Sequence, residues 1–210
     1  ISEKLPTVEE ADCAITSIAY LDKVTGDREV LVLDIEGRLK DINTEYSVQV
    51  FRDERDMLTH FINRFAEIQP TVITGWNTDG FDIPYLVNRI KRTMGSGAVK
   101  KLSPAGIVEW LKHRSKYRIA GVSSLDYLPL YKNFTYSQES SYSLEAISQK
   151  ELGKGKMKYD GSLDDLLKSD IQAYIDYNMN DVDLVVELDQ KMKLIDLQLY
   201  ILNLIESMTH

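Results

Sequence analysis

The chain has 210 residues, 43% of them hydrophobic and 28% charged, a composition typical of a globular protein that can bury a core. A single cysteine excludes a disulfide framework and a cysteine-based zinc site, and no apolar run reaches membrane-spanning length. The net charge of −8 argues against a general nucleic-acid coat. We therefore expect one cytoplasmic domain over residues 1–210 without membrane association, cut from a longer protein because no initiator methionine is present.

The N-terminal part reads as β-structure. Strand-like residues 14–21 and 29–35 flank the turn at 25–27, which predicts a β-hairpin with Cys13 buried on its first strand. Residues 46–51 are a candidate third strand.

A helix and a strand signal then alternate. Asp53 is placed to cap a helix whose apolar residues recur at helical spacing until Pro70 ends it. A short buried strand at 71–74 precedes a second helix at 83–94, which Gly95 closes.

The second half begins with a segment that glycine and proline interrupt, residues 96–121. Within it, 107–111 and 117–120 can pair as a basic hairpin. Further helices are expected at 126–134, at 144–152 and from 163 onward, with 170 to about 207 forming one long helix or two. Lysine and arginine cluster over 100–118 and 150–158, which fits either local contact with a phosphate backbone or a solvated surface.

The most informative stretch is Gly75 to Leu86, where the buried strand passes into the second helix. Gly75 and Gly80 allow tight turns there, and Pro84 suits the first turn of the helix. Ligands of α/β proteins usually bind at the ends of such strands. Asp82, at this junction, is therefore the first candidate for a functional residue.

A second candidate set lies in the last helical segment, at Tyr177 and Asp181. These residues are four apart, so they share one helix face beside an apolar stripe. Taken alone, the pair also fits a tyrosine packed in the core with an aspartate at its rim. Combined with Asp82, the two carboxylates and the phenol indicate a divalent-cation site, since Mg²⁺ takes oxygen ligands and couples carboxylates to phosphates.

The residues of both sets resemble those of family B DNA polymerases. The family's second exonuclease motif resembles Trp76-Asn77-x-x-x-Phe81-Asp82-x-Pro84-Tyr85, and its third, tyrosine-containing motif resembles Tyr177-x-x-x-Asp181. Three intervening segments are similar to the T-even-type phage members: Ser124-Leu125-Asp126-Tyr127, Ser141-Tyr142-Ser143-Leu144 and Gly155-Lys156-x-Lys158-Tyr159-Asp160-Gly161.

This resemblance implies a fold and a reaction. The fold would be ribonuclease H-like, an α/β architecture with a mixed sheet flanked by helices and acidic residues at one edge. The reaction would be proofreading, the hydrolytic removal of the 3′-terminal nucleotide of DNA by a two-metal site holding Mg²⁺ or Mn²⁺. The partners would be a single-stranded 3′ primer end and the polymerase domains of a parent chain, inside a phage-infected host cell.

The resemblance also implies residue roles. Asp82 and Asp181 would be metal ligands, and Tyr177 would orient the attacking water. Asn77 and Phe81 would position the 3′ end. Two lysines complete the expected site: Lys156 would neutralise charge at the phosphate and Lys158 would contact the substrate, while the basic hairpin resembles the family's strand-separating hairpin.

The family's first motif, Asp-x-Glu, leaves two alternatives. Asp34-Ile35-Glu36 matches its letters, but it ends the second strand of the hairpin, whereas the family's motif precedes the hairpin. We expect the motif upstream of Ile1, with the first strand then missing, and keep Asp34 and Glu36 as the alternative ligands. Two functions follow: a catalytic 3′–5′ exonuclease domain, or a non-catalytic DNA-binding or structural module of the same fold.

Overall fold

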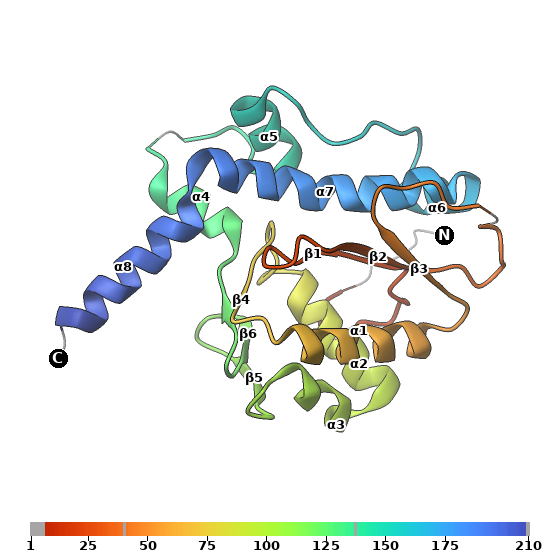
Figure 1. Cartoon of the computed structure of the whole chain (residues 1–210), viewed down its shortest axis with the longest axis horizontal. Coiled ribbons are helices and arrows are strands. Elements are labelled where there is room, and N and C mark those ends of the chain that lie inside the picture. Colours follow the sequence, from red (N-terminus) through yellow and green to blue (C-terminus); the bar gives the residue numbers. More distant parts are fainter. Residues whose placement is uncertain (1–6, 40, 137, 209–210) are drawn as a thin grey trace.

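The computed structural model describes residues 7–39, 41–136 and 138–208, and a mixed three-stranded sheet lies at its centre (Figure 1). Strand β1 (Ser17–Leu21) runs antiparallel to β2 (Arg28–Leu33), which confirms the predicted hairpin. Strand β3 (Ser47–Phe51) pairs with the other edge of β2 in parallel orientation.

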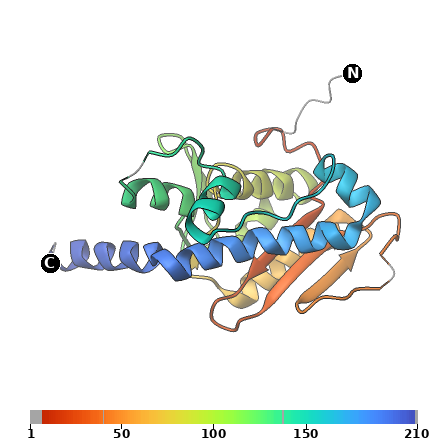
Figure 2. The same cartoon turned by 90° about the horizontal axis from the view of Figure 1, so that it is seen from above.

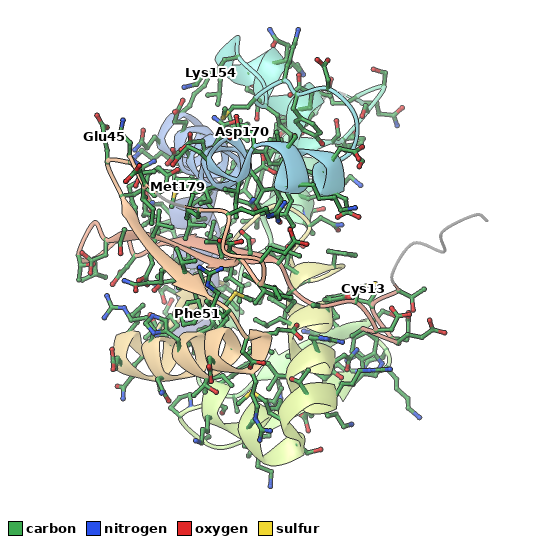
Figure 3. All side chains as sticks on the ribbon, turned by 90° about the vertical axis from the view of Figure 1, so that its right-hand side faces the viewer. Cys13, Glu45, Phe51, Lys154, Asp170 and Met179 are labelled. Atoms are coloured by element: carbon green, nitrogen blue, oxygen red, sulfur yellow. The ribbon has the colours of Figure 1, made fainter. Side chains whose placement is uncertain are left out.

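Helices cover both faces of this sheet because β2 alternates its buried side chains. Val30 and Val32 pack with helix α7 (Ile171–Met192), whereas Leu31 and Leu33 pack toward helix α1 (Glu54–Ile68). Each buried aliphatic side chain contributes about 1.5–3 kcal/mol, so β2 is the principal strand of the core. Figure 3 shows the layers from the side, with Met179 of α7 on one side of the sheet and Phe51 on the side of α1.

The segment after β3 follows the expected order. Asp53 caps α1 through its side chain, which accepts hydrogen bonds from two backbone amides of the first turn. Strand β4 (Val72–Ile73) pairs in parallel with β7 (Ser123–Ser124), and helix α2 (Asp82–Met94) ends at Gly95, whose φ is 85°.

Two short helices after Gly95 were not predicted. Helix α3 (Ser96–Val99) and the 3₁₀ helix η1 (Lys100–Leu102) form despite Gly97, because Val99 and Leu102 are buried in the cluster of α1 and α2. Burial here overrides weak helix propensity. The predicted basic hairpin is confirmed as β5 (Val108–Leu111) and β6 (Lys116–Ile119), paired antiparallel.

The second half is helical. Helices α4 (Tyr127–Phe134) and α5 (Leu144–Leu152) pack with the C-terminal half of α7 in a cluster that includes Tyr127, Tyr131 and Leu188. Helix α6 (Leu163–Ser169) leads into α7. The predicted long segment is two helices, since Lys193 adopts a left-handed conformation (φ 57°) between α7 and α8 (Leu194–Met208).

Helix α7 crosses the sheet, and α8 continues beyond the rest of the molecule (Figure 2). None of the helices in the described part of the chain is both long enough and apolar enough to cross a membrane. One local expectation was wrong: Cys13 is exposed and lies before β1, not on it, since the strand begins only at Ser17.

Candidate active site

The loop between β4 and α2 brings Asp82 to the start of a helix. Asn77 adopts a left-handed backbone conformation (φ 61°), and its carbonyl accepts a hydrogen bond from the Gly80 amide at 3.1 Å. The Ile83 amide then bonds to the Thr78 carbonyl at 2.9 Å, so the turn runs directly into α2. Gly80 suits this turn because a Cβ there would lie 2.6 Å from Asn77 Oδ1.

The surroundings of Asp82 disfavour its charged form. Desolvation by burial is the main cause that raises its pKa to about 6, and the negative charges of Asp126 and Asp181 act in the same direction. Its own backbone N–H and the Lys156 ammonium oppose the shift. Asp82 as a residue keeps solvent exposure, so a crowded carboxyl group lies at a position that water and ligands can reach.

Helix α7 presents Tyr177 and Asp181 on one face, as predicted, and Lys156 bridges them. Lys156 Nζ donates to Asp181 Oδ2 at 2.6 Å and to the Tyr177 hydroxyl at 3.1 Å. Burial alone would lower the pKa of Lys156, but its hydrogen bond to Asp181 and the charge of Asp181 raise it, so the lysine is a cation. Glu145 accepts the backbone N–H of Lys156 and holds this part of the loop.

Asp181 retains unused acceptor capacity. Burial raises its pKa, while the hydrogen bond and charge of Lys156 lower it. Its second oxygen, Oδ1, is buried and has no hydrogen-bond partner. A buried carboxylate oxygen without a partner costs free energy, and a cation or a proton would satisfy it.

These donors fit a divalent cation. Asp82 and Asp181 interact through their charges, and the free Oδ1 atom of Asp181 is an oxygen ligand of the kind that Mg²⁺ and Mn²⁺ bind. Within residues 7–39, 41–136 and 138–208, no group of three or more His, Cys, Asp or Glu side chains is placed to hold a metal. The described residues therefore offer the two carboxylates of Asp82 and Asp181. Proteins often bind Mg²⁺ through one or two carboxylates when substrate phosphates supply further ligands.

Asp34 and Glu36 make other contacts, within the turn after β2. The buried Asp34 carboxylate accepts hydrogen bonds from the backbone amides of Gly37, Arg38 and Leu39 at 2.9–3.1 Å. Burial alone would raise the pKa of Asp34, but these hydrogen bonds and the Arg52 charge hold it below its usual value. The Glu36 side chain is 72% exposed and pairs with Arg38 at 3.3 Å. The structure thus uses Asp34 to fix the turn after β2.

The three expected substrate-binding residues occupy different environments. Asn77 forms the turn before Asp82, and Phe81, 46% exposed, stacks on Tyr85 with ring centroids 5.6 Å apart. Lys158 is exposed in the loop between α5 and α6, close in sequence to Lys156.

Asp126 and Asp79 have no function predicted from the sequence, yet both hold the loop of Asp82. The Asp126 carboxylate accepts the amides of Asn77 and Asp79, and the Asp79 carboxylate accepts from Ser124 Oγ and Lys116 Nζ. The sequence marks Asp126 only as the first residue of a predicted helix and as part of a segment similar to the phage family members. The hydrogen bonds of Asp126 to Asn77 and Asp79 join segments far apart in the sequence, so no local sequence pattern predicts them.

Comparison with known proteins gives consistent matches. The family described as "DNA polymerase family B, exonuclease domain" matches residues 2–147. Over 155 residues the chain is 43% identical to the DNA-directed DNA polymerase of Enterobacteria phage T4 and 41% identical to that of Escherichia phage RB69, in each case over 71% of this chain and 17% of the relative. DNA polymerase 1 of Sulfurisphaera ohwakuensis is 28% identical over 203 residues, which are 90% of this chain and 21% of that protein.

The chain thus spans about a fifth of the length of these relatives. The family match covers most of the chain, and it includes the turn and helix that carry Asp82. Asp181 and Tyr177 lie beyond the family match, in α7. This chain belongs to the exonuclease domain family of the family B DNA polymerases.

Proposed function

We propose that this chain is a 3′–5′ proofreading exonuclease domain that removes the 3′-terminal nucleotide of DNA with a two-metal site. One observation carries the proposal: α2 and α7, far apart in sequence, bring Asp82, Asp181 and the Lys156–Tyr177 pair into one electrostatically coupled group. Residues with strongly shifted pKa values and specific charge partners are typical of functional sites.

The proposed fold is ribonuclease H-like, with residues 1–210 acting as a single domain. Support comes from the mixed sheet between α1 and α7 and from the acidic residues at the start of α2.

In the proposed mechanism, Asp82 and Asp181 would hold the cations. When bound, Mg²⁺ or Mn²⁺ supplies an activated water and stabilises the negative charge that develops on the scissile phosphate. Lys156, whose ammonium now neutralises Asp181, can turn toward a phosphate oxygen, and the Tyr177 hydroxyl is placed to orient the water. Charged groups held in place before the reaction stabilise the transition state most effectively.

The substrate would be a single-stranded 3′ end. The exposed ring of Phe81 offers a stacking surface for a base, Asn77 shapes the turn beside it, and Lys158 offers a cation for the backbone. The basic β5–β6 hairpin would separate the 3′ end from its template strand. The partners would be DNA and the polymerase domains of a parent chain, in the cytoplasm of an infected host cell.

A second candidate function is a non-catalytic DNA-binding or structural module of the same fold. It is favoured by the use of Asp34 in a backbone turn and by the lack, among the described residues, of a group of three or more side chains placed to hold a metal. Two carboxylates alone would bind two cations only weakly.

Cleavage of 3′-labelled single-stranded DNA distinguishes these functions. The chain is incubated with Mg²⁺ or Mn²⁺ beside the variants Asp82→Ala and Asp34→Ala. Loss of label with the wild type, but not with Asp82→Ala, supports the exonuclease. Absence of cleavage by the wild type supports the non-catalytic module, and activity retained by Asp34→Ala excludes Asp34 as a ligand.

A further inference from the structure

We infer that Asp126 is a positioning residue for the exonuclease site, which it serves by fixing the loop of residues 74–81 that carries Asp82. The inference rests on the proposed function, because the value of a fixed Asp82 lies in metal binding. Asp126 belongs neither to the predicted ligand set nor to the residues expected to touch DNA.

The backbone pairing of β4 with β7 continues for a few residues beyond the strands and then stops. The Leu125 amide bonds to the Ile73 carbonyl at 2.9 Å, and the Tyr127 amide bonds to the Gly75 carbonyl at 2.8 Å. After Gly75 the two segments diverge, because one enters α4 and the other enters the turn before α2. From that point the turn needs another source of hydrogen-bond acceptors.

The Asp126 carboxylate provides these acceptors. Its Oδ1 accepts the Asn77 amide at 2.9 Å, and its Oδ2 accepts the Asp79 amide at 3.0 Å. Oδ1 also accepts the Leu128 amide at 3.1 Å, so the same side chain caps α4. Asp126 is only 5% exposed, which keeps the carboxylate in one place and strengthens its hydrogen bonds.

The constraint passes from Asp126 to Asp82 through Asn77. Left-handed backbone conformations are unfavourable for residues with a side chain, although asparagine tolerates them better than most. The amide of Asn77 is held by Asp126, and its carbonyl accepts the amides that close the turn into α2. The amide and the carbonyl of Asn77 are therefore both held by hydrogen bonds. Fixing the backbone of Asn77 in turn fixes the position of Asp82, the first residue of α2.

A second anchor holds the loop through a side chain. The Asp79 carboxylate accepts hydrogen bonds from Ser124 Oγ at 2.6 Å and from Lys116 Nζ at 2.7 Å. These contacts fix the Asp79 side chain but not its backbone amide, whose acceptor is Asp126. Replacing Asp126 should therefore speed hydrogen exchange at the backbone amides of Asn77 and Asp79 specifically.

The variant Asp126→Ser separates the two roles of the carboxylate. Serine is a good N-cap and can still accept the Leu128 amide, but its side chain is too short to reach the amides of the loop. The matched control is Asp53→Ser. Asp53 also caps a helix, but its carboxylate accepts only the amides of its own first turn, at Arg55 and Asp56.

The test measures amide hydrogen exchange by NMR in the 210-residue chain, without metal or DNA, and Mn²⁺ affinity in a separate titration. In Asp126→Ser, the Asn77 and Asp79 amides should exchange about tenfold faster than in the wild type, the effect of losing a hydrogen bond to a charged acceptor. Mn²⁺ should bind severalfold more weakly. Asp53→Ser should change neither quantity.

Unchanged exchange at Asn77 and Asp79 would overturn the inference, as would faster exchange with unaltered Mn²⁺ affinity. An equal acceleration in Asp53→Ser would overturn it too, since a loss of global stability would then be the cause. If wild-type protein binds no Mn²⁺ and cuts no DNA, the proposed function fails. The exchange data still report on whether Asp126 holds the loop.

Discussion

Replacing Asp82 with asparagine should stabilise the metal-free protein at pH 8. The pKa of Asp82 is raised from its ordinary value of 3.8 to about 6, mainly by burial, so the fold disfavours the ionised carboxylate. A pKa shift of about two units corresponds to roughly 3 kcal/mol of free energy. Because Asp82 is exposed to solvent, we expect Asp82→Asn to raise the free energy of unfolding by only about 1 kcal/mol. Asparagine fills the same volume without the charge.

The pH dependence follows from the sign of the shift. Between pH 4 and pH 6 the folded protein binds more protons at Asp82 than the unfolded chain, so this group makes wild-type stability fall as the pH rises through that window. The advantage of Asp82→Asn should therefore be absent near pH 4 and complete above about pH 6.

The assay is urea unfolding in the presence of a chelator at several pH values. Asp56→Asn is the control, because Asp56 is also an exposed acidic residue in the first turn of a helix, α1, but is not part of the candidate site. The free energy of unfolding of the control should fall by a few tenths of a kcal/mol, about the stabilisation that a negative charge gives near a helix N-terminus. Mn²⁺ should stabilise the wild type and not Asp82→Asn. An Asp82→Asn protein no more stable than wild type at pH 8 would show that the charge of Asp82 does not destabilise the fold.

Three further substitutions test the remaining site. Lys156→Met should reduce the rate of DNA cleavage at least tenfold, because the cation at the phosphate is lost. Mn²⁺ affinity should not fall, because the Asp181 carboxylate loses its ion pair and stays available to the metal. The control Lys154→Met removes a lysine from an exposed ion pair and should change neither quantity. Tyr177→Phe should keep the fold and Mn²⁺ affinity but slow cleavage about tenfold, because only the water-orienting hydroxyl is lost. Asp34→Asn should cost about 2 kcal/mol in urea unfolding with Mn²⁺ affinity intact, because it breaks buried hydrogen bonds. The Asp34 contribution is complete above pH 3.8 and is lost as the pH falls below it, since hydrogen bonds lower its pKa.

The sequence predicts those elements of the fold whose signals are local. The N-cap Asp53 and the helix end at Gly95 are predicted from the sequence and are confirmed. The helices α3 and η1 were missed because only tertiary burial of Val99 and Leu102 stabilises them. The break at Lys193 was left open because neither proline nor glycine marks it.

Prediction of the site has a similar limit. The spacing of Tyr177 and Asp181 places them on one helix face, and the structure agrees. Matching letters could not show that the Asp34 carboxylate turns toward the backbone of its own loop. The contacts of Asp126 join segments that are distant in sequence, so only the three-dimensional arrangement shows them.

The most direct test of the central claim is the length of 5′-labelled single-stranded DNA over time with the chain and Mn²⁺. The wild type should give a ladder of products that shorten from the 3′ end one nucleotide at a time. The DNA should stay intact with Asp82→Ala and with Asp181→Ala. Immediate release of the 5′ label, an uncut strand with the wild type, or the same ladder with Asp82→Ala would contradict it.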